Sequence, residues 1–232
     1  MERIHNESII HSYLRIHRLH RFFSGFSEEE IQLYRFYKGE MIYINGEEIT
    51  NMYFVVDGKV KIYTNTMDDK RLILRFQKAL AVIGDIEFIY NDPAMHSVEA
   101  SSECLAISVP YRIIREKLGK NPDFLHYLLE TVTQKFRSKT TSATLNLLYP
   151  VEVRFASYLL SVSNGYSDPI FHEEMKDISL VDISETIGTS YRHLNRVIQK
   201  LSQEGIIKRG KQGIQIIDMD KLKEIAQDNI YE

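Results

Sequence analysis

A chain of 232 residues with a formal net charge of −3 has room for two domains of ordinary size, and it is not a uniformly basic nucleic-acid binder. Hydrophobic residues make up 44% of the chain and aromatic residues 11%, which excludes a disordered chain and allows packed cores. The charge is unevenly spread: residues 176–213 hold seven Lys or Arg against four Asp or Glu, a local excess of three positive charges that suits an anionic partner met at one end of the chain.

Only one cysteine is present, Cys104. It cannot form an intramolecular disulfide or hold an iron–sulfur cluster alone, and its apolar neighbours predict a buried, inert thiol. The N-terminus lacks the apolar segment and cleavage site of a signal peptide, and no stretch approaches the roughly 18 apolar residues of a membrane span. These features predict a cytoplasmic protein that does not contact a membrane.

The predicted elements begin with helical structure over residues 7–37, where Ser27 and the three acids after it resemble the start of a helix. From Lys38 to Val109 the pattern changes to short alternating or apolar runs that are separated by turn residues. Their spacing of about ten residues predicts the strands of a small β-barrel or sandwich. The six runs begin at Met41, Met52, Val60, Leu72, Ser97 and Cys104.

A long helix is predicted after Asn121, because Pro122 fits the first turn of a helix. Apolar side chains then recur at spacings of three and four over about 25 residues, which is more than a neighbouring barrel normally covers. We therefore interpret this segment as a dimer helix packed against its own copy, with a long helix lying on the barrel as the alternative. The expected dimer interface is Leu125, Leu129, Val132, Phe136 and Ala143.

Residues 178–217 are predicted to form a winged helix-turn-helix. Ser179 and Asp182 have the spacing of a helix N-cap and its third residue, and Gly188 permits a sharp turn to a second helix that Ser190 can cap. The apolar positions of the second helix follow the i, i+3, i+4, i+7 pattern of one buried face. These positions are Leu194, Val197, Ile198 and Leu201.

With that face inward, the second helix presents polar side chains to the outside, as a recognition helix does. Arginine can pair with guanine, asparagine with adenine, and lysine or tyrosine can hold phosphates. A glycine-rich basic hairpin, the wing, follows and would meet phosphate. A solvated helix of mixed charge is the alternative for any one arginine, but a capped helix, a turn, a basic helix and a basic hairpin in this order favour DNA binding. The predicted DNA-binding residues are Ser190, Tyr191, Arg192, Asn195, Arg196, Gln199, Lys200, Lys208, Arg209 and Lys211.

The whole order resembles the Crp/Fnr family of bacterial transcription regulators over roughly residues 20–217. Glycine-marked fragments such as Ile83-Gly84-Asp85 fall where the family has its β-roll turns, and the pattern from Ile183 to Arg196 matches its helix-turn-helix. The run from Ser190 to Leu194 is most similar to the YeiL-like subgroup. The resemblance implies a homodimer that binds double-stranded DNA at a palindromic operator, with RNA polymerase open as a further partner.

The fold class implied is α+β, with three segments along the chain. Residues 1–120 are expected to form a β-roll (jelly-roll-like) domain with N-terminal helices, residues 121–148 the dimerisation helix, and residues 149–232 the winged helix-turn-helix domain. Pro150 ends the long helix, and we place the hinge at residues 145–150.

Departures from the family pattern concern the effector. Family members that bind cyclic AMP carry an Arg-Ser pair after the Gly-Glu of the phosphate cassette. Counted from Gly84 and Asp85, this chain has Met95 and His96 there, and methionine offers a phosphate neither charge nor a donor. These four residues are the effector-pocket candidates, but cyclic AMP control of the usual kind is not expected. The effector is unknown, and no cofactor is predicted, although a haem with an axial histidine stays open.

The recognition helix departs from the family as well. The common Ser-Arg-Glu start is here Ser190-Tyr191-Arg192, so a cation replaces the glutamate that accepts from cytosine, and only Arg196 carries over directly. We therefore expect an operator that differs from the common half-site.

The sequence also bears on a metal site, on enzyme activity and on a rival function. His11, His17 and His20 lie near one another, but no nearby acid or cysteine completes a metal site, so no metal is predicted. The sequence contains no nucleophile–base signature and no phosphate-cradling glycine loop, so no enzyme activity is expected. The rival function is a small-molecule-sensing β-roll module that acts mainly through protein partners, in which Arg192 and Arg196 would be unimportant.

Overall fold

The structure is a computed structural model of the chain, and it divides into two compact units, residues 1–135 and 136–232. One long helix runs across this division, and each unit is described by itself. The predicted three-segment division of the chain stays a prediction. The residues that the structure describes are 1–65, 71–163, 179–210, 213–227 and 229.

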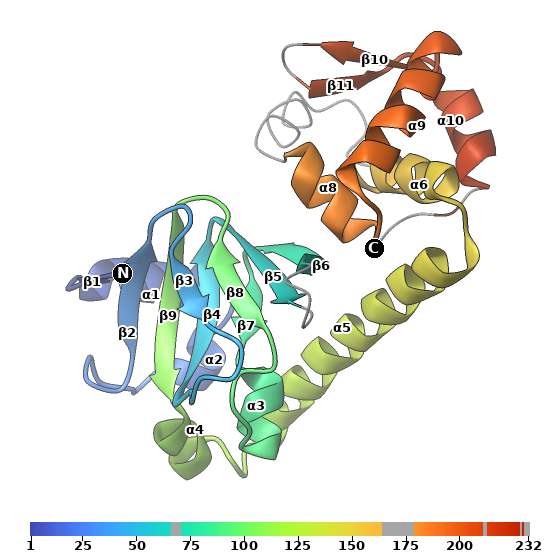
Figure 1. Cartoon of the computed structure of the whole chain (residues 1–232). Helices are drawn as coiled ribbons and strands as arrows, with labels where there is room; N and C mark the ends of the chain where they lie inside the picture. The colour runs from blue at the N-terminus through green and yellow to red at the C-terminus, as the bar shows by residue number, and fades with distance from the viewer. Residues whose placement is uncertain (66–70, 164–178, 211–212, 228, 230–232) are drawn as a thin grey trace. The chain divides into compact units, whose positions relative to one another are not determined.

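The N-terminal unit contains two antiparallel sheets (Figure 1). The first sheet consists, in order across it, of β1 (Glu2–Ile4), β2 (Gln32–Phe36), β9 (Cys104–Pro110), β4 (Asn51–Asp57) and β7 (Ala81–Ile83). The second consists of β3 (Met41–Tyr43), β8 (Ser97–Ala100), β5 (Lys59–Asn65) and β6 (Arg71–Lys78). All six strands predicted after Lys38 are present, and strands far apart in sequence are neighbours, as in a jelly-roll-like β-roll. The predicted fold of this part is confirmed.

Two layers of apolar side chains stabilise the first sheet. On one face, Tyr53 and Val55 of β4 join a core with Val60 and Ile62 of β5 in the second sheet. On the other face, Phe54 belongs to a core that the helices complete. Because β4 is buried on both faces, its sequence is a continuous apolar run and not an alternating one.

Helices cover the second face of this sheet. Aromatic rings meet edge to face there, with ring centroids 5.1 Å apart for Phe23 and Phe54 and 5.3 Å apart for Phe22 and Phe124. The helices that contribute to this core are α1 (Glu7–Ile16), α2 (His20–Phe23), α4 (Tyr111–Lys117), the first part of α5 (Pro122–Leu148) and, through Phe88, the short helix α3 (Asp85–Tyr90) that follows β7.

The expectation of helical structure throughout residues 7–37 is wrong in its second half. Gln32–Phe36 forms β2, which pairs with β9 across about 70 residues of sequence. The Glu30 carboxylate accepts from the Ser27 backbone N–H at 2.8 Å, so this capping pair closes a single turn instead of starting a helix. Pairing with a distant strand has decided the conformation over the local pattern. The helices α3 and α4 were not predicted.

The long helix α5 is present over 27 residues, as predicted. The Asn121 side chain accepts from the Phe124 backbone N–H at 3.1 Å and caps its start. Phe124 and Leu128 enter the core of the N-terminal unit, while Leu145 enters the core of the C-terminal unit.

The C-terminal unit has one core, to which all its described helices and both strands contribute. The two strands form an antiparallel hairpin. These elements are α6 (Val151–Ser163), α8 (Leu180–Thr186), α9 (Tyr191–Gln203), β10 (Ile207–Gly210), β11 (Gly213–Ile216) and α10 (Met219–Ala226). The order α8, α9, hairpin is the predicted winged helix-turn-helix, whereas α10 was not predicted. Within the residues described, no helix is long and apolar enough to span a bilayer.

Candidate nucleic-acid interface

The two helices of the helix-turn-helix begin at the caps that the sequence predicts. Ser179 Oγ accepts from the Asp182 N–H at 3.0 Å, and Ser190 Oγ accepts from the His193 N–H at 3.2 Å. Gly188, between the helices, has φ +63°, a conformation that glycine adopts at little cost. The two serine caps therefore set where α8 and α9 begin, and Gly188 allows the turn between them.

The apolar face of α9 is buried as expected: Leu194, Val197, Ile198 and Leu201 are at most 7% exposed. The opposite face is polar and open to solvent. Arg192, Arg196 and Gln199 are exposed on it, and Asn195 is half-buried. An exposed arginine on such a face can reach the edge of a base in the major groove.

The hairpin contacts α9 through Arg209 of β10. Its guanidinium Nη1 donates to Asn195 Oδ1 at 3.0 Å. Hydrogen bonds from Asn195 and Arg209 also lower the pKa of the exposed Tyr191 phenol. Lys208 on the same strand is exposed, and Lys211 lies outside the described residues. The structure thus brings three of the predicted DNA-binding residues into one hydrogen-bonded group.

Lys200, near the end of α9, already has anionic partners. Its ammonium lies 2.7 Å from a Glu152 carboxylate oxygen at the start of α6 and 4.0 Å from Glu204. The hydrogen bond to Glu152 raises the pKa of Lys200. A DNA phosphate would compete with Glu152 for this cation.

Arg154 of α6 supports the turn between α8 and α9, and no sequence pattern singled it out. This side chain is buried, and its Nη1 donates to the carbonyl oxygens of Ile187 and, at 3.3 Å, of Gly188. A further contact reaches Asn146 Oδ1 of α5 at 3.4 Å. A cation at the end of a helix satisfies carbonyls that have no partner within the helix.

In the N-terminal unit, the predicted effector candidates Gly84 and Asp85 lie at the start of α3. Gly84 has φ +88°, and a Cβ there would lie 2.6 Å from the Tyr111 hydroxyl oxygen, so the position requires glycine. The same hydroxyl donates to the Gly84 carbonyl oxygen at 2.6 Å. Met95 is 48% exposed, and His96 is half-buried.

Asp85 is 2% exposed, and it has a partner that sequence reasoning missed. The Lys135 ammonium of α5 lies 2.5 Å from Asp85 Oδ1 and donates to the Val82 carbonyl oxygen at 2.7 Å. Burial lowers the pKa of Lys135, and the Asp85 charge opposes that effect. Burial also lowers the pKa of Arg75, again opposed by Asp85. The Asp85 position therefore lies among cations that come from α5 and β6.

The predicted dimer-interface residues divide by exposure. Leu125, Leu129 and Phe136 are 41%, 63% and 73% exposed. Val132 and Ala143 are half-buried. Large apolar side chains in such exposed positions on one helix are typical of a surface that another chain covers.

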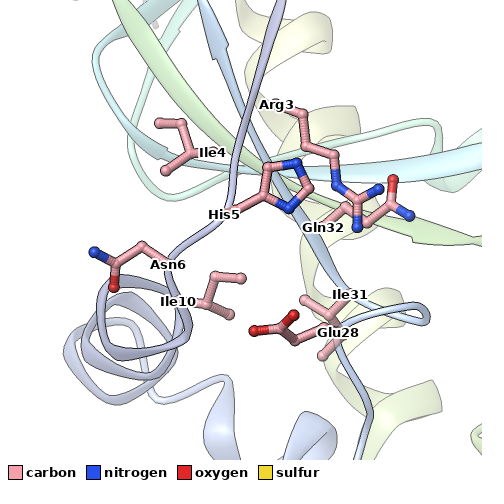
Figure 2. Close-up of a pocket in the computed structure, with 8 residues that line it drawn as sticks. All are labelled: Arg3, Ile4, His5, Asn6, Ile10, Glu28, Ile31 and Gln32. Atoms are coloured by element: carbon pink, nitrogen blue, oxygen red, sulfur yellow. The ribbon is translucent and has the colours of Figure 1, made fainter.

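Two small cavities lie in the N-terminal unit, of about 10 and 60 Å³. Figure 2 shows the smaller, where Arg3, His5 and Glu28 surround a space next to the start of α1. None of the predicted site residues lines either cavity. Among the residues described, no three His, Cys, Asp or Glu side chains are grouped so as to hold a metal ion.

Two segments of the chain match known protein domains. Residues 33–121 match the model of the cyclic nucleotide-binding domain, and residues 153–225 match the Crp-like helix-turn-helix domain. A β-roll of that type joined to this helix-turn-helix defines a transcription regulator.

The relatives define the family. The chain is 25% identical to Regulatory protein YeiL of Escherichia coli O157:H7 over 197 residues, which cover 85% of this chain and 86% of that protein. It is 22% identical to Regulatory protein HlyX of Actinobacillus pleuropneumoniae over 80% of this chain and 78% of that protein. The structure of FixK2 from Bradyrhizobium japonicum has the same fold, with a TM-score of 0.69 at 20% identity, covering 84% of this chain and 96% of that one. Both matched domains and these relatives are those of Crp/Fnr transcription regulators, to which the chain is similar over most of its length.

Proposed function

We propose that the protein is a sequence-specific DNA-binding regulator that acts as a homodimer on a palindromic operator. The observation that carries the proposal is the exposed polar face of α9, where Arg192 and Arg196 lie opposite a buried apolar face. Two such helices in a dimer would enter successive major grooves about 34 Å apart. The chain would then act in the bacterial cytoplasm, with RNA polymerase as a further partner.

The exposed apolar residues of α5 support the dimer. Phe136 and Leu129 are the most exposed of the predicted interface residues. Burying such side chains against a second copy would stabilise the dimer by roughly 25 cal/mol for each Å² removed from water. Native mass spectrometry of the protein from its host should report a dimer and any retained ligand, and Phe136→Glu should give monomers.

We further propose that cyclic AMP does not control this protein in the usual way. Met95 supplies no charge for a cyclic phosphate, and the Asp85 carboxylate is already paired with Lys135. Met95 therefore cannot balance the charge of a cyclic phosphate, and the Asp85 carboxylate would have to leave Lys135 to contact a nucleotide.

DNA binding measured across salt concentrations tests the main proposal. The logarithm of the affinity should fall linearly with the logarithm of salt, by about 0.9 for each phosphate contact. Arg196→Ala should relax base preference at one position of each half-site by about 1–3 kcal/mol. The matched control is Arg112→Ala in α4, since Arg112 is exposed but lies in the other unit.

If operator affinity and base preference survived Arg196→Ala, the assignment of α9 as the recognition helix would be wrong. That result would favour the rival function, a β-roll module that acts through protein partners. The known relatives are transcription regulators, which agrees with a chain that is not an enzyme.

A further inference from the structure

Arg209 of the wing differs from the neighbouring cation Lys208 in what it contacts. Lys208 is exposed at the start of the hairpin, whereas Arg209 reaches across to α9 and donates to Asn195 Oδ1 at 3.0 Å. A wing residue that served only as a phosphate contact would have no need of this bond. The contact therefore indicates that Arg209 also positions a side chain of α9.

Tyr191 joins Asn195 and Arg209 in one group, because Asn195 lies one helical turn after it. Both Asn195 and Arg209 are hydrogen-bonded to the Tyr191 phenol and lower its pKa. Arg209 thus contacts both the Asn195 amide oxygen and the Tyr191 phenol.

This arrangement engages the oxygen of the Asn195 amide within the protein. Asparagine recognises adenine by accepting from N6 and donating to N7 at the same time. In this group the amide oxygen, which would accept from adenine N6, already accepts from Arg209. What remains to face a base is a set of donors: the unused guanidinium N–H groups, the amide N–H groups and the phenol O–H.

We propose that Arg209 is a specificity-determining residue, which holds Asn195 away from adenine reading and gives the first half of α9 a donor surface that selects guanine. Guanine presents only acceptors, O6 and N7, to the major groove, whereas adenine presents one acceptor and one donor. The inference rests on the proposed function, since it needs α9 to enter the major groove. It changes the role of Arg209 from that of a wing cation to that of a positioning residue for base readout.

A phosphate oxygen is also an acceptor, so the same donors could bind a DNA phosphate instead of guanine. A phosphate contact adds affinity on every sequence alike, whereas a base contact depends on the base pair at one position. The test must therefore separate a uniform loss of affinity from a shift in base preference.

The experiment first selects operators for the wild-type protein from random duplexes, and then measures the affinity of variants for duplexes with each half-site base pair exchanged. Arg209→Lys keeps the charge but loses the planar fork that can bridge two partners. We expect Arg209→Lys to release Asn195 and to move the preference at one half-site position from guanine toward adenine by roughly 5- to 150-fold. The double variant Arg209→Lys with Asn195→Ala should lose that gain for adenine. Lys208→Ala is the matched wing control: it should weaken binding to all duplexes alike, as the loss of a phosphate contact does, and leave the base preference unchanged.

A measurement without DNA checks the hydrogen-bonded group itself. The difference between the alkaline titrations of the wild-type protein and Tyr191→Phe reports the Tyr191 phenol. Its midpoint should rise in Arg209→Lys, because the bridging donor is lost. An unchanged midpoint would overturn the inference even if the variant bound DNA poorly.

Three outcomes of the DNA measurement are decisive. A guanine-to-adenine shift in Arg209→Lys supports the inference. A base preference that Arg209→Lys leaves intact, with Arg209→Ala weakening all duplexes alike and reducing the salt slope by about one, makes Arg209 a phosphate contact and overturns it. A wild-type protein that selects no sequence at all overturns the proposed function together with this inference.

Discussion

In the N-terminal unit the Lys135 cation that pairs with Asp85 is buried, whereas in the C-terminal unit the described cations of α9 and of β10 are exposed to solvent. The Lys135 side chain is 9% exposed and its partner Asp85 3% exposed, while the side chains of Lys200 and Glu152 are 54% and 28% exposed. Both pairs have similar distances, 2.5 and 2.7 Å between the charged atoms. The two ion pairs therefore differ in their exposure to solvent and not in the distance between their charges.

The difference teaches which charges remain available to a partner. A buried pair that lost one member would leave an uncompensated charge in a poorly solvated place, so Lys135 and Asp85 are fixed to each other. An exposed pair exchanges its partner for water or phosphate at little cost. Lys135 therefore serves the structure of the N-terminal unit, whereas Lys200 stays accessible to the DNA phosphates of the proposed function.

The largest effect is expected from Lys135→Met, which tests the buried side of the comparison. It should lower the free energy of unfolding of the N-terminal unit by about 3–5 kcal/mol, because Asp85 would stay buried without its partner. Denaturant unfolding of the full chain, followed by a probe in that unit, measures the change. Replacing both residues, Asp85→Leu with Lys135→Met, should restore most of the stability. If the single variant were as stable as the wild-type protein, the buried pair would not be formed in solution.

Ser190→Ala is expected to have an intermediate effect. Loss of the N-cap bond to His193 should destabilise the C-terminal unit by about 1 kcal/mol. Thermal unfolding monitors the change, and Ser202→Ala, within the same helix, is a control that removes a hydroxyl away from the cap. Similar losses in both variants would show that the cap is not what Ser190 contributes.

The smallest effect is expected from Glu152→Gln, on the exposed side of the comparison. Removing this carboxylate should leave the unfolding midpoint essentially unchanged and should raise DNA affinity a few-fold at low salt, because Lys200 is released and one negative charge near the DNA is lost. Against the single variant Lys200→Ala, adding Glu152→Gln should give a smaller gain, because only the loss of the negative charge then contributes. A large loss of stability in the single variant would contradict the contrast with Lys135.

The sequence predicted the position and the buried face of α9 well because the signals for them are local. The caps at Ser179 and Ser190, the glycine turn, and the spacing of Leu194 and Leu201 all lie within one short segment, and their neighbours in sequence are their neighbours in space. Once the buried face is known, the exposed face follows from helical geometry. The exposure of Arg192 and Arg196 could therefore be foreseen.

The features that could not be predicted from the sequence depend on contacts between distant segments. The strand Gln32–Phe36 follows a helical pattern, and only its pairing with β9 makes it a strand. Asp85 and Lys135 are 50 residues apart, and no spacing rule brings them together. The bond from Arg209 to Asn195 likewise depends on how the hairpin folds back on α9. In each case the residue type can be read from the sequence, whereas its partner is seen only in the structure.

The turn between α8 and α9 has a further consequence for how the protein meets DNA. Arg154, which lies outside the helix-turn-helix, fastens that turn to α6 by bonds to the Ile187 and Gly188 carbonyl oxygens. The angle between the two helices is thus set before any DNA arrives, and binding does not have to order them. A preorganised surface loses little conformational entropy on association, so discrimination between operators falls to the side chains of α9 and to how well each DNA sequence bends to meet a rigid shape.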